Sequence, residues 1–255
     1  MPEILSLYSS LCLIRPLESC LDCSSSSSSD LPKVLKVYTI AHKYRACAIE
    51  ERVKEIAVGL ATPDDIRSHI SPSLTAIHIY DTAIDVECEE IAGVLRGVIV
   101  EDSWGGKITP FDMLALGECF DDPEFLGLAH YQIVLLGRDV WSNSSHLTIS
   151  HRDHLTTGLL NLYKEWDTVL KAWTSEDGIF HDCASLCGTG ESLWKVYQRL
   201  NVDNLPSFNV IGRLKIIEMI RFDCDCAQRI PTLVKWKREE IERKLPDLFS
   251  LRGRK

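Results

Sequence analysis

The stretch SHRDHLTTGLLNLYKEWDTVLKAW, residues 150–173, decides the fold class, because its apolar residues follow the period of an α-helix. These apolar side chains recur every three or four positions, so they share one helix face. They are Leu155, Leu159, Leu162, Trp166, Leu170 and Trp173. We therefore predict a long amphipathic helix here, with this face in the core and both tryptophans buried.

Other segments repeat this pattern, and several begin with a capping residue followed by proline, a typical helix start. Such pairs stand at residues 62–63, 71–72, 109–110 and 122–123. The predicted helices are 30–46, 48–60, 62–66, 71–83, 85–101, 109–120, 122–141, 150–173, 191–200, 205–222 and 234–249. Alternating runs of β-branched residues are nearly absent. The sequence thus predicts an all-α fold, an array of roughly ten to twelve short helices packed as antiparallel pairs.

The first two predicted helices have apolar faces of their own. In 30–46, the helix is expected to start at Asp30, and the apolar face is formed by Val34, Leu35, Tyr38, Ala41 and Tyr44. In 48–60, the face is formed by Ile49, Val53, Ile56 and Leu60. Short helices with one apolar face bury it by packing against other helices, so we expect both faces to contribute to the core.

Composition excludes several classes of protein. The 255 residues are 45% hydrophobic, enough for a packed core, so disorder throughout is excluded. There are 28 Lys and Arg against 37 Asp and Glu, a net charge of −9, which argues against nucleic acid as a partner. No apolar run approaches the length that spans a membrane, and no export signal is evident. We therefore expect an intracellular protein, cytoplasmic or nuclear.

Four of the ten cysteines form two close pairs that could ligate a metal. Cys183 and Cys187 stand in HDCASLC, and Cys224 and Cys226 in DCDC. A zinc-stabilised helical domain built on these four thiols is the alternative hypothesis. However, the spacings differ from the usual C-x₂-C, and Cys224 and Cys226 would point about 200° apart on a helix. We favour free thiols packed as small apolar side chains, with no metal and no cofactor.

Residues that could carry catalysis are also scarce. His151 and His154 lie three positions apart, a spacing compatible with metal ligands, but we expect them to be solvated in the exposed first turn of a helix. The glycines of GTGES, residues 188–192, follow no strand and precede no Lys-Ser or Lys-Thr pair, so a phosphate loop is not indicated. No segment combines a nucleophile, a base and an oxyanion donor. We therefore predict a protein that is not an enzyme.

Three segments resemble a known family in their order along the chain. VLKVYTIAHKYRACAIEERV, residues 34–53, resembles the closing helices of BTB/POZ domains in the large fungal family of BTB-domain proteins. LTISHRDHLTTGLLNLYKEWDTVLKAW and LPSFNVIGRLKIIEM are similar to the helical C-terminal region of those proteins. The resemblance implies a BTB remnant and serine-rich loop in 1–30, the end of the BTB domain and a BACK-like helical region in 31–140, and a C-terminal helical region in 141–255.

The resemblance also implies a function. Proteins of this family act through other proteins, so a non-enzymatic interaction module is expected, an adaptor or scaffold whose partners could include cullin-type ubiquitin ligases. Most of the BTB sheet is expected to be missing, and BTB-type dimerisation is therefore not expected. The apolar residues within 1–29 should either fold back onto the helical body or remain as an exposed patch.

Overall fold

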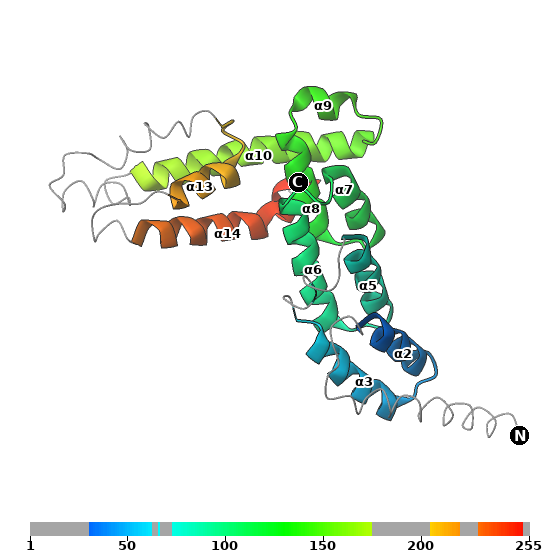
Figure 1. Ribbon diagram of the computed structural model, residues 1–255. Helices are drawn as coiled ribbons and strands as arrows, with labels where there is room; N and C mark the ends of the chain where they lie inside the picture. The colour runs from blue at the N-terminus through cyan, green and yellow to red at the C-terminus, as the bar shows by residue number, and fades with distance from the viewer. Residues whose placement is uncertain (1–30, 63–65, 67–72, 175–204, 220–228, 252–255) are drawn as a thin grey trace, which may run out of the picture. The chain divides into compact units, whose positions relative to one another are not determined.

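The computed structural model describes residues 31–62, 66, 73–174, 205–219 and 229–251, which form ten helices and no strand (Figure 1). The helices are α2 (Leu31–Lys43), α3 (Cys47–Leu60), α5 (Ser73–Asp85), α6 (Glu89–Trp104), α7 (Pro110–Cys119), α8 (Pro123–Leu135), α9 (Arg138–Asn143), α10 (Ile149–Thr174), α13 (Val210–Glu218) and α14 (Arg229–Phe249). The expected all-α class is confirmed. Across the described ranges, no helix is both long and apolar enough to cross a bilayer.

The chain divides into two compact units, residues 1–108 and 109–255. The first unit contains α2, α3, α5 and α6, and the second contains the helices from α7 onward. This division differs from the boundary at residue 140, which follows from the family resemblance and stays a prediction.

The described part of the first unit consists of two helix pairs. α2 packs against α3, and α5 against α6, while contacts of α2 with α5 and of α3 with α6 join the pairs. Leu35 and Tyr38 of α2 are buried together with Val53 of α3, as their spacing predicts. Tyr44, however, is 67% exposed, because α2 ends at Lys43 and the backbone turns at Arg45, whose φ is 52°. The predicted apolar face of α2 is therefore one residue too long.

Local side-chain chemistry sets the starts of two helices in the second unit. The Thr109 hydroxyl accepts a hydrogen bond from the amide of Asp112 at 3.2 Å and caps α7. The Asp122 carboxylate accepts from the amides of Glu124 at 2.9 Å and Phe125 at 3.2 Å and caps α8. Both caps precede a proline, so the sequence signal at these two positions is confirmed.

Several predicted helices have different limits in the structure. The helix expected over 205–222 begins only at Val210, and the helix expected over 234–249 already begins at Arg229. The helix expected over 85–101 begins only at Glu89, because the chain turns at Glu87, which has a φ of 54°. The helix expected over 122–141 is two helices, α8 and α9, because Gly137 has a φ of 95° and breaks the hydrogen-bond ladder.

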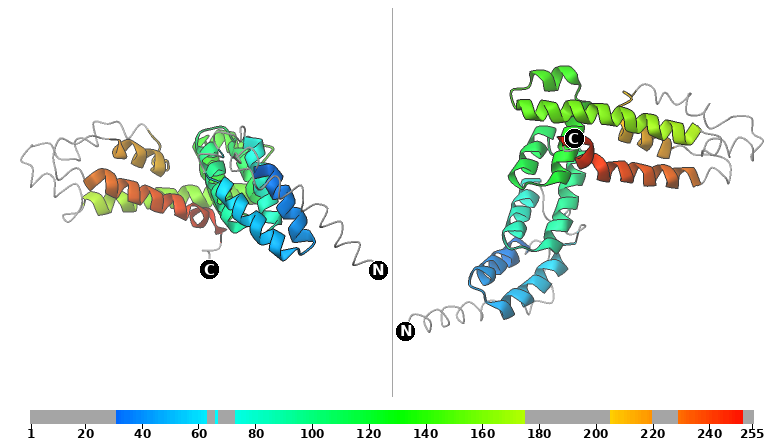
Figure 2. Two further views of the ribbon diagram at one scale, coloured as in Figure 1. Left: turned by 60° about the horizontal axis from the view of Figure 1, so that its bottom comes forward. Right: turned by 180° about the vertical axis from the view of Figure 1, so that it is seen from behind.

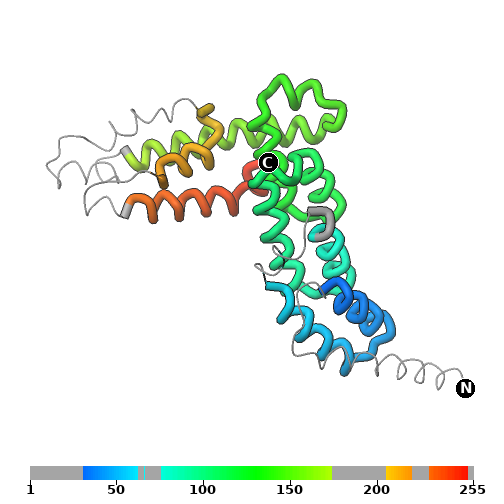
Figure 3. Tube along the Cα trace, viewed as in Figure 1, coloured from blue at the N-terminus to red at the C-terminus, as the bar shows by residue number. Residues whose placement is uncertain are grey.

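In the second unit, helices distant in sequence lie side by side. α7 and α8 form a hairpin, and α8 contacts α10 and α14, so the end of the described chain packs against its middle (Figures 2 and 3). α13 packs against both α10 and α14. Leu155, Leu162, Trp166 and Trp173 of α10 are buried, as predicted. Leu159 and Leu170, expected in the same buried set, are half-buried.

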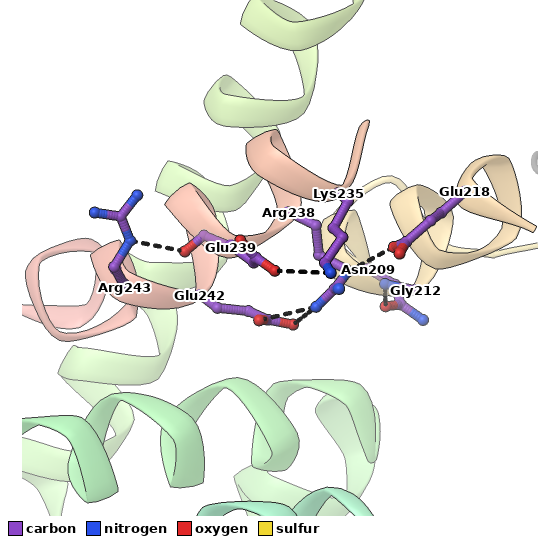
Figure 4. Close-up of polar contacts among 8 residues, drawn as sticks. All are labelled: Asn209, Gly212, Glu218, Lys235, Arg238, Glu239, Glu242 and Arg243. Atoms are coloured by element: carbon purple, nitrogen blue, oxygen red, sulfur yellow. Dashed lines mark hydrogen bonds and ion pairs between the residues drawn. The ribbon is translucent and has the colours of Figure 1, made fainter. Parts of the chain in front are cut away.

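Charged side chains join α13 to α14 (Figure 4). Arg238 of α14 donates from Nε to Glu218 of α13 at 2.9 Å, and from Nη1 to both carboxylate oxygens of Glu242 at 2.8 and 3.0 Å. At the other end of α13, the Asn209 side chain caps the helix by accepting from the amide of Gly212 at 3.0 Å. Arg213 of α13 lies over the Trp166 ring of α10, 5.0 Å from its centre. These contacts hold the three helices in one arrangement.

Candidate functional site

The second unit contains a hollow of about 550 Å³ where α7, α8, α10 and α14 meet. Its lining combines histidine, carboxylate and hydroxyl side chains with a few apolar residues. The lining residues are Glu118, Asp121, Pro123, Leu126, Gly127, His130, Ser150, His151, His154, Pro246, Asp247, Phe249 and Ser250. A volume of this order suits a small ligand or a short piece of peptide.

His151 is held in one orientation at the start of α10. Its Nδ1 atom accepts a hydrogen bond from the amide of Thr148 at 3.2 Å, while the Thr148 hydroxyl accepts from the amide of His151 at the same distance. The two residues thus form a capping box in which histidine takes the usual place of glutamate. Because Nδ1 accepts, the proton of the neutral ring lies on Nε2, which donates to the Glu118 carboxylate at 2.8 Å. Both ring nitrogens of His151 are therefore engaged.

His154, one turn further along α10, is fixed by the end of α14. Its Nδ1 atom lies 2.6 Å from the backbone carbonyl oxygen of Phe249. A carbonyl only accepts, so Nδ1 carries the proton and donates. In the neutral ring the other nitrogen, Nε2, is then unprotonated and can accept a hydrogen bond.

His130 of α8 is the most buried histidine of the site, at 6% exposure. Its ring stacks on those of His154 and Phe249, each with its centre 5.5 Å away, and lies 6.3 Å from the ring of His151. Its Nε2 atom has no hydrogen-bond partner among the described residues. Burial, with a smaller effect of the two neighbouring histidines, lowers the pKa of His130 from 6.5 to about 3. The ring is therefore neutral near pH 7.

Because of this low pKa, we predict that the stability of the second unit falls as the pH falls from 7 to 5. Unfolded His130 takes up a proton near pH 6.5, whereas the folded ring resists protonation until about pH 3. The unfolded state then binds more protons, and the free energy of unfolding decreases on acidification, by at most about 1.4 kcal/mol per pH unit for this group. Urea unfolding at several pH values measures the slope.

The matched comparison for this prediction is His130→Leu against His146→Gln. His146 is exposed, so its replacement should leave the pH dependence of unfolding unchanged. His130→Leu should make the free energy of unfolding depend less steeply on pH between 7 and 5. If the free energy of unfolding changes equally with pH in the wild type and in His130→Leu, the pH dependence does not come from His130.

The arrangement of acceptors defines what the hollow can bind. Among the described residues, Nε2 of His154 has no hydrogen-bond partner, and the carboxylates of Glu118, Asp121 and Asp247 line the same hollow. No lysine or arginine is among the lining residues of the described chain. Within the described ranges, no three His, Cys, Asp or Glu side chains are placed to hold a metal ion. The hollow is thus rich in hydrogen-bond acceptors and negative charge.

A smaller hollow of about 390 Å³ lies next to the first and shares Glu118 with it. It is lined mainly by α7 residues, among them Phe111, whose ring lies 5.5 Å from that of His146. Glu118 therefore stands between two hollows, with its side chain 53% exposed.

The four thiols of the alternative hypothesis, Cys183, Cys187, Cys224 and Cys226, lie outside the described residues, as does the segment 1–30. Free thiols in place of a zinc site therefore remain a prediction. We expect an unchanged melting temperature in excess chelator, because a structural metal would contribute its binding energy to folding. A marked drop in melting temperature, abolished by Cys183→Ser, would establish the zinc-stabilised domain instead.

Sequence reasoning missed the centre of the hollow. His151 and His154, expected to be solvated, are hydrogen-bonded, and the His151 side chain is only 13% exposed. His130 carries a weak sequence signal, since it and Gln132 are the polar residues inside the otherwise mainly apolar run LGLAHYQIVLL, residues 126–136. Such a residue is usually a core histidine with a partner, and only the missing partner of Nε2 within the described chain distinguishes it.

Comparisons with family models, with characterised proteins and with solved structures find no match to this chain.

Proposed function

We propose that this chain is a non-enzymatic protein-interaction module, an intracellular adaptor or scaffold that binds a partner protein at the hollow formed by α7, α8, α10 and α14. The observation that carries the proposal is the lining of this hollow, which gathers the carboxylates of Glu118, Asp121 and Asp247 and, among the described residues, no lysine or arginine. Acceptors and negative charge gathered at one concave surface favour a partner that supplies hydrogen-bond donors or positive charge.

Further features are consistent with an intracellular protein that has a binding role. The three described cysteines, Cys47, Cys88 and Cys119, are free thiols, consistent with a reducing compartment. The hydrogen bonds of His151 and His154 to a carboxylate, a backbone amide and a backbone carbonyl fix the orientation of two rings that line the hollow. The resemblance to fungal BTB-domain proteins points the same way and suggests an adaptor role, with a cullin-type ubiquitin ligase as one candidate partner.

Site-specific photo-crosslinking tests the proposal. A photoreactive phenylalanine at Ser150, which lines the hollow, should form discrete adducts with partner proteins in cells. The same group at Ser145, which is exposed but does not line the hollow, is the control. Adducts specific to position 150 support a docking site. Their absence, or an identical set from both positions, would contradict it.

A further inference from the structure

Helix α2 has a second apolar face besides the one that is buried in the first unit. Val37, Ile40 and Tyr44 follow one another at intervals of three and four residues, so they lie on one side of the helix. The amide of Tyr44 donates to the carbonyl of Ile40 at 3.1 Å, which places Tyr44 one turn beyond Ile40. Ile40 is 45% exposed, Tyr44 is 67% exposed and Val37 is half-buried. We call these three residues the outer face of α2, and apolar side chains exposed together in this way are typical of an interaction surface.

Lysines accompany the outer face along α2. The helix contains Lys33, Lys36 and Lys43, all exposed, and no acidic residue, although the whole chain has a net charge of −9. An apolar stripe beside lysines favours an occupant that combines apolar side chains with negative charge. A second copy of this chain that paired through the same face would bring the lysines of both copies together, and like charges repel. The face therefore suits a different segment, one that is apolar and acidic.

The chain itself contains a segment of this composition before α2. Residues 1–30, which lie outside the described residues, carry four acidic side chains against one basic side chain. Within residues 4–14, apolar side chains recur at helical spacing, at Ile4, Leu7, Tyr8, Leu11 and Ile14. The connection from this run to α2, residues 15–30, can span about 50 Å when extended, whereas α2 is about 20 Å long. The run can therefore reach every turn of α2.

We propose that residues 4–14 of this chain pack on the outer face of α2. This contact removes the exposed side chains of Ile40 and Tyr44 from water and brings an acidic segment to a helix that carries only basic charges. The covalent tether gives the run a high effective concentration at α2, so it competes well against a free peptide of similar affinity. Both parts belong to the first unit, so the contact is separate from the docking proposed at the hollow of the second unit.

Photo-crosslinking within the purified full chain tests which segment lies on the outer face. A photoreactive phenylalanine in place of Tyr44 should form adducts within the same chain, and mass spectrometry should map them to residues 4–14. The same group in place of Ile84, which is 41% exposed on α5, is the control and should not react with this run. Adducts between two copies, adducts with other parts of the chain, no adducts at all, or the same adducts from both positions would overturn the proposal.

Thiol labelling of the full chain gives a second measurement, because Cys12 lies inside the apolar run and Cys20 and Cys23 follow it. A water-soluble maleimide should modify Cys12 about tenfold more slowly than Cys20 and Cys23, since a thiol packed against α2 reacts only when the contact opens. Mass spectrometry of samples taken over time measures the three rates. Equal rates at the three thiols would show that the run is not packed.

A matched pair of variants assigns the protection to the outer face. Ile40→Gln with Tyr44→Gln makes this face polar and should raise the labelling rate of Cys12 about tenfold. Val58→Gln with Ile84→Gln changes two apolar residues that are 38% and 41% exposed elsewhere in the first unit, and should change the rate by less than about twofold. All four side chains are exposed, so folding is preserved. Equal rates of Cys12 labelling in the two variants would overturn the assignment to α2.

A second pair of variants tests the charges. Lys36→Glu with Lys43→Glu reverses two exposed charges of α2 and should raise the labelling rate of Cys12 about threefold, because the acidic segment is then repelled. Arg52→Glu with Lys107→Glu reverses two exposed charges elsewhere in the first unit and should change this rate by less than about 1.5-fold. The same rate in both variants would contradict the charge complementarity that selects this segment.

Discussion

Replacing Leu162 by alanine is expected to lower the free energy of unfolding of the second unit by about 2 to 5 kcal/mol. Leu162 is completely buried on α10, a helix that packs against α8, α13 and α14. Truncation removes apolar contacts and leaves a cavity that surrounding helices fill only in part. Denaturant unfolding followed by tryptophan fluorescence measures the change, with the denaturant dependence expected to stay constant.

Leu160→Ala is the matched control for this prediction, because it makes the same chemical change two positions away. Leu160 is 50% exposed on the same helix. Its replacement should change the free energy of unfolding by less than about 1 kcal/mol, as is usual for partly exposed positions. Similar losses at residues 160 and 162 would show that this face of α10 is not the core.

The second large effect is expected for Gly127→Ala in α8. A Cβ atom at residue 127 would lie 2.6 Å from the backbone nitrogen of Pro246 and 2.8 Å from the carbonyl carbon of Leu245. These atoms belong to the backbone of α14, so they cannot rotate away, and the two helices must separate. Overpacking of this kind costs about 1 to 3 kcal/mol or more, and thermal unfolding should show the loss.

Gly97→Ala in α6 provides the opposite expectation for the same substitution. Gly97 is also inside a helix, but no atom of the described chain would lie within 4 Å of the added Cβ. Alanine there should stabilise the first unit by about 0.5 to 1 kcal/mol through its higher helix propensity. If both alanines stabilise the protein, the close approach of α8 and α14 is wrong.

The extents of most helices were predictable from the sequence because helix signals are local. The Thr109-Pro110 and Asp122-Pro123 pairs marked two starts correctly, since a capping side chain bonds to amides only two or three residues ahead. The helix limits that were predicted wrongly near Glu87 and Gly137 also have a local cause. Each residue adopts a positive φ inside a segment predicted to be one continuous helix, and the helical spacing of its apolar residues does not reveal such a break.

The candidate site was not predictable in this way, because its parts come from four helices. His154 meets the carbonyl of Phe249, and His130 stacks between residues of α10 and α14, at separations that no local pattern encodes. Many apolar helix faces in this chain are interchangeable as packing partners when read from sequence alone. The sequence by itself determined the all-α class, the starts of α7 and α8 and the buried face of α10. Only the tertiary structure decided that α8, α10 and α14 meet. The backbone of α14 lies close to Gly127 of α8, and the Phe249 side chain of α14 lies close to Gly158 of α10, so small residues at these two positions select this packing. The same packing gathers the three histidines around one hollow.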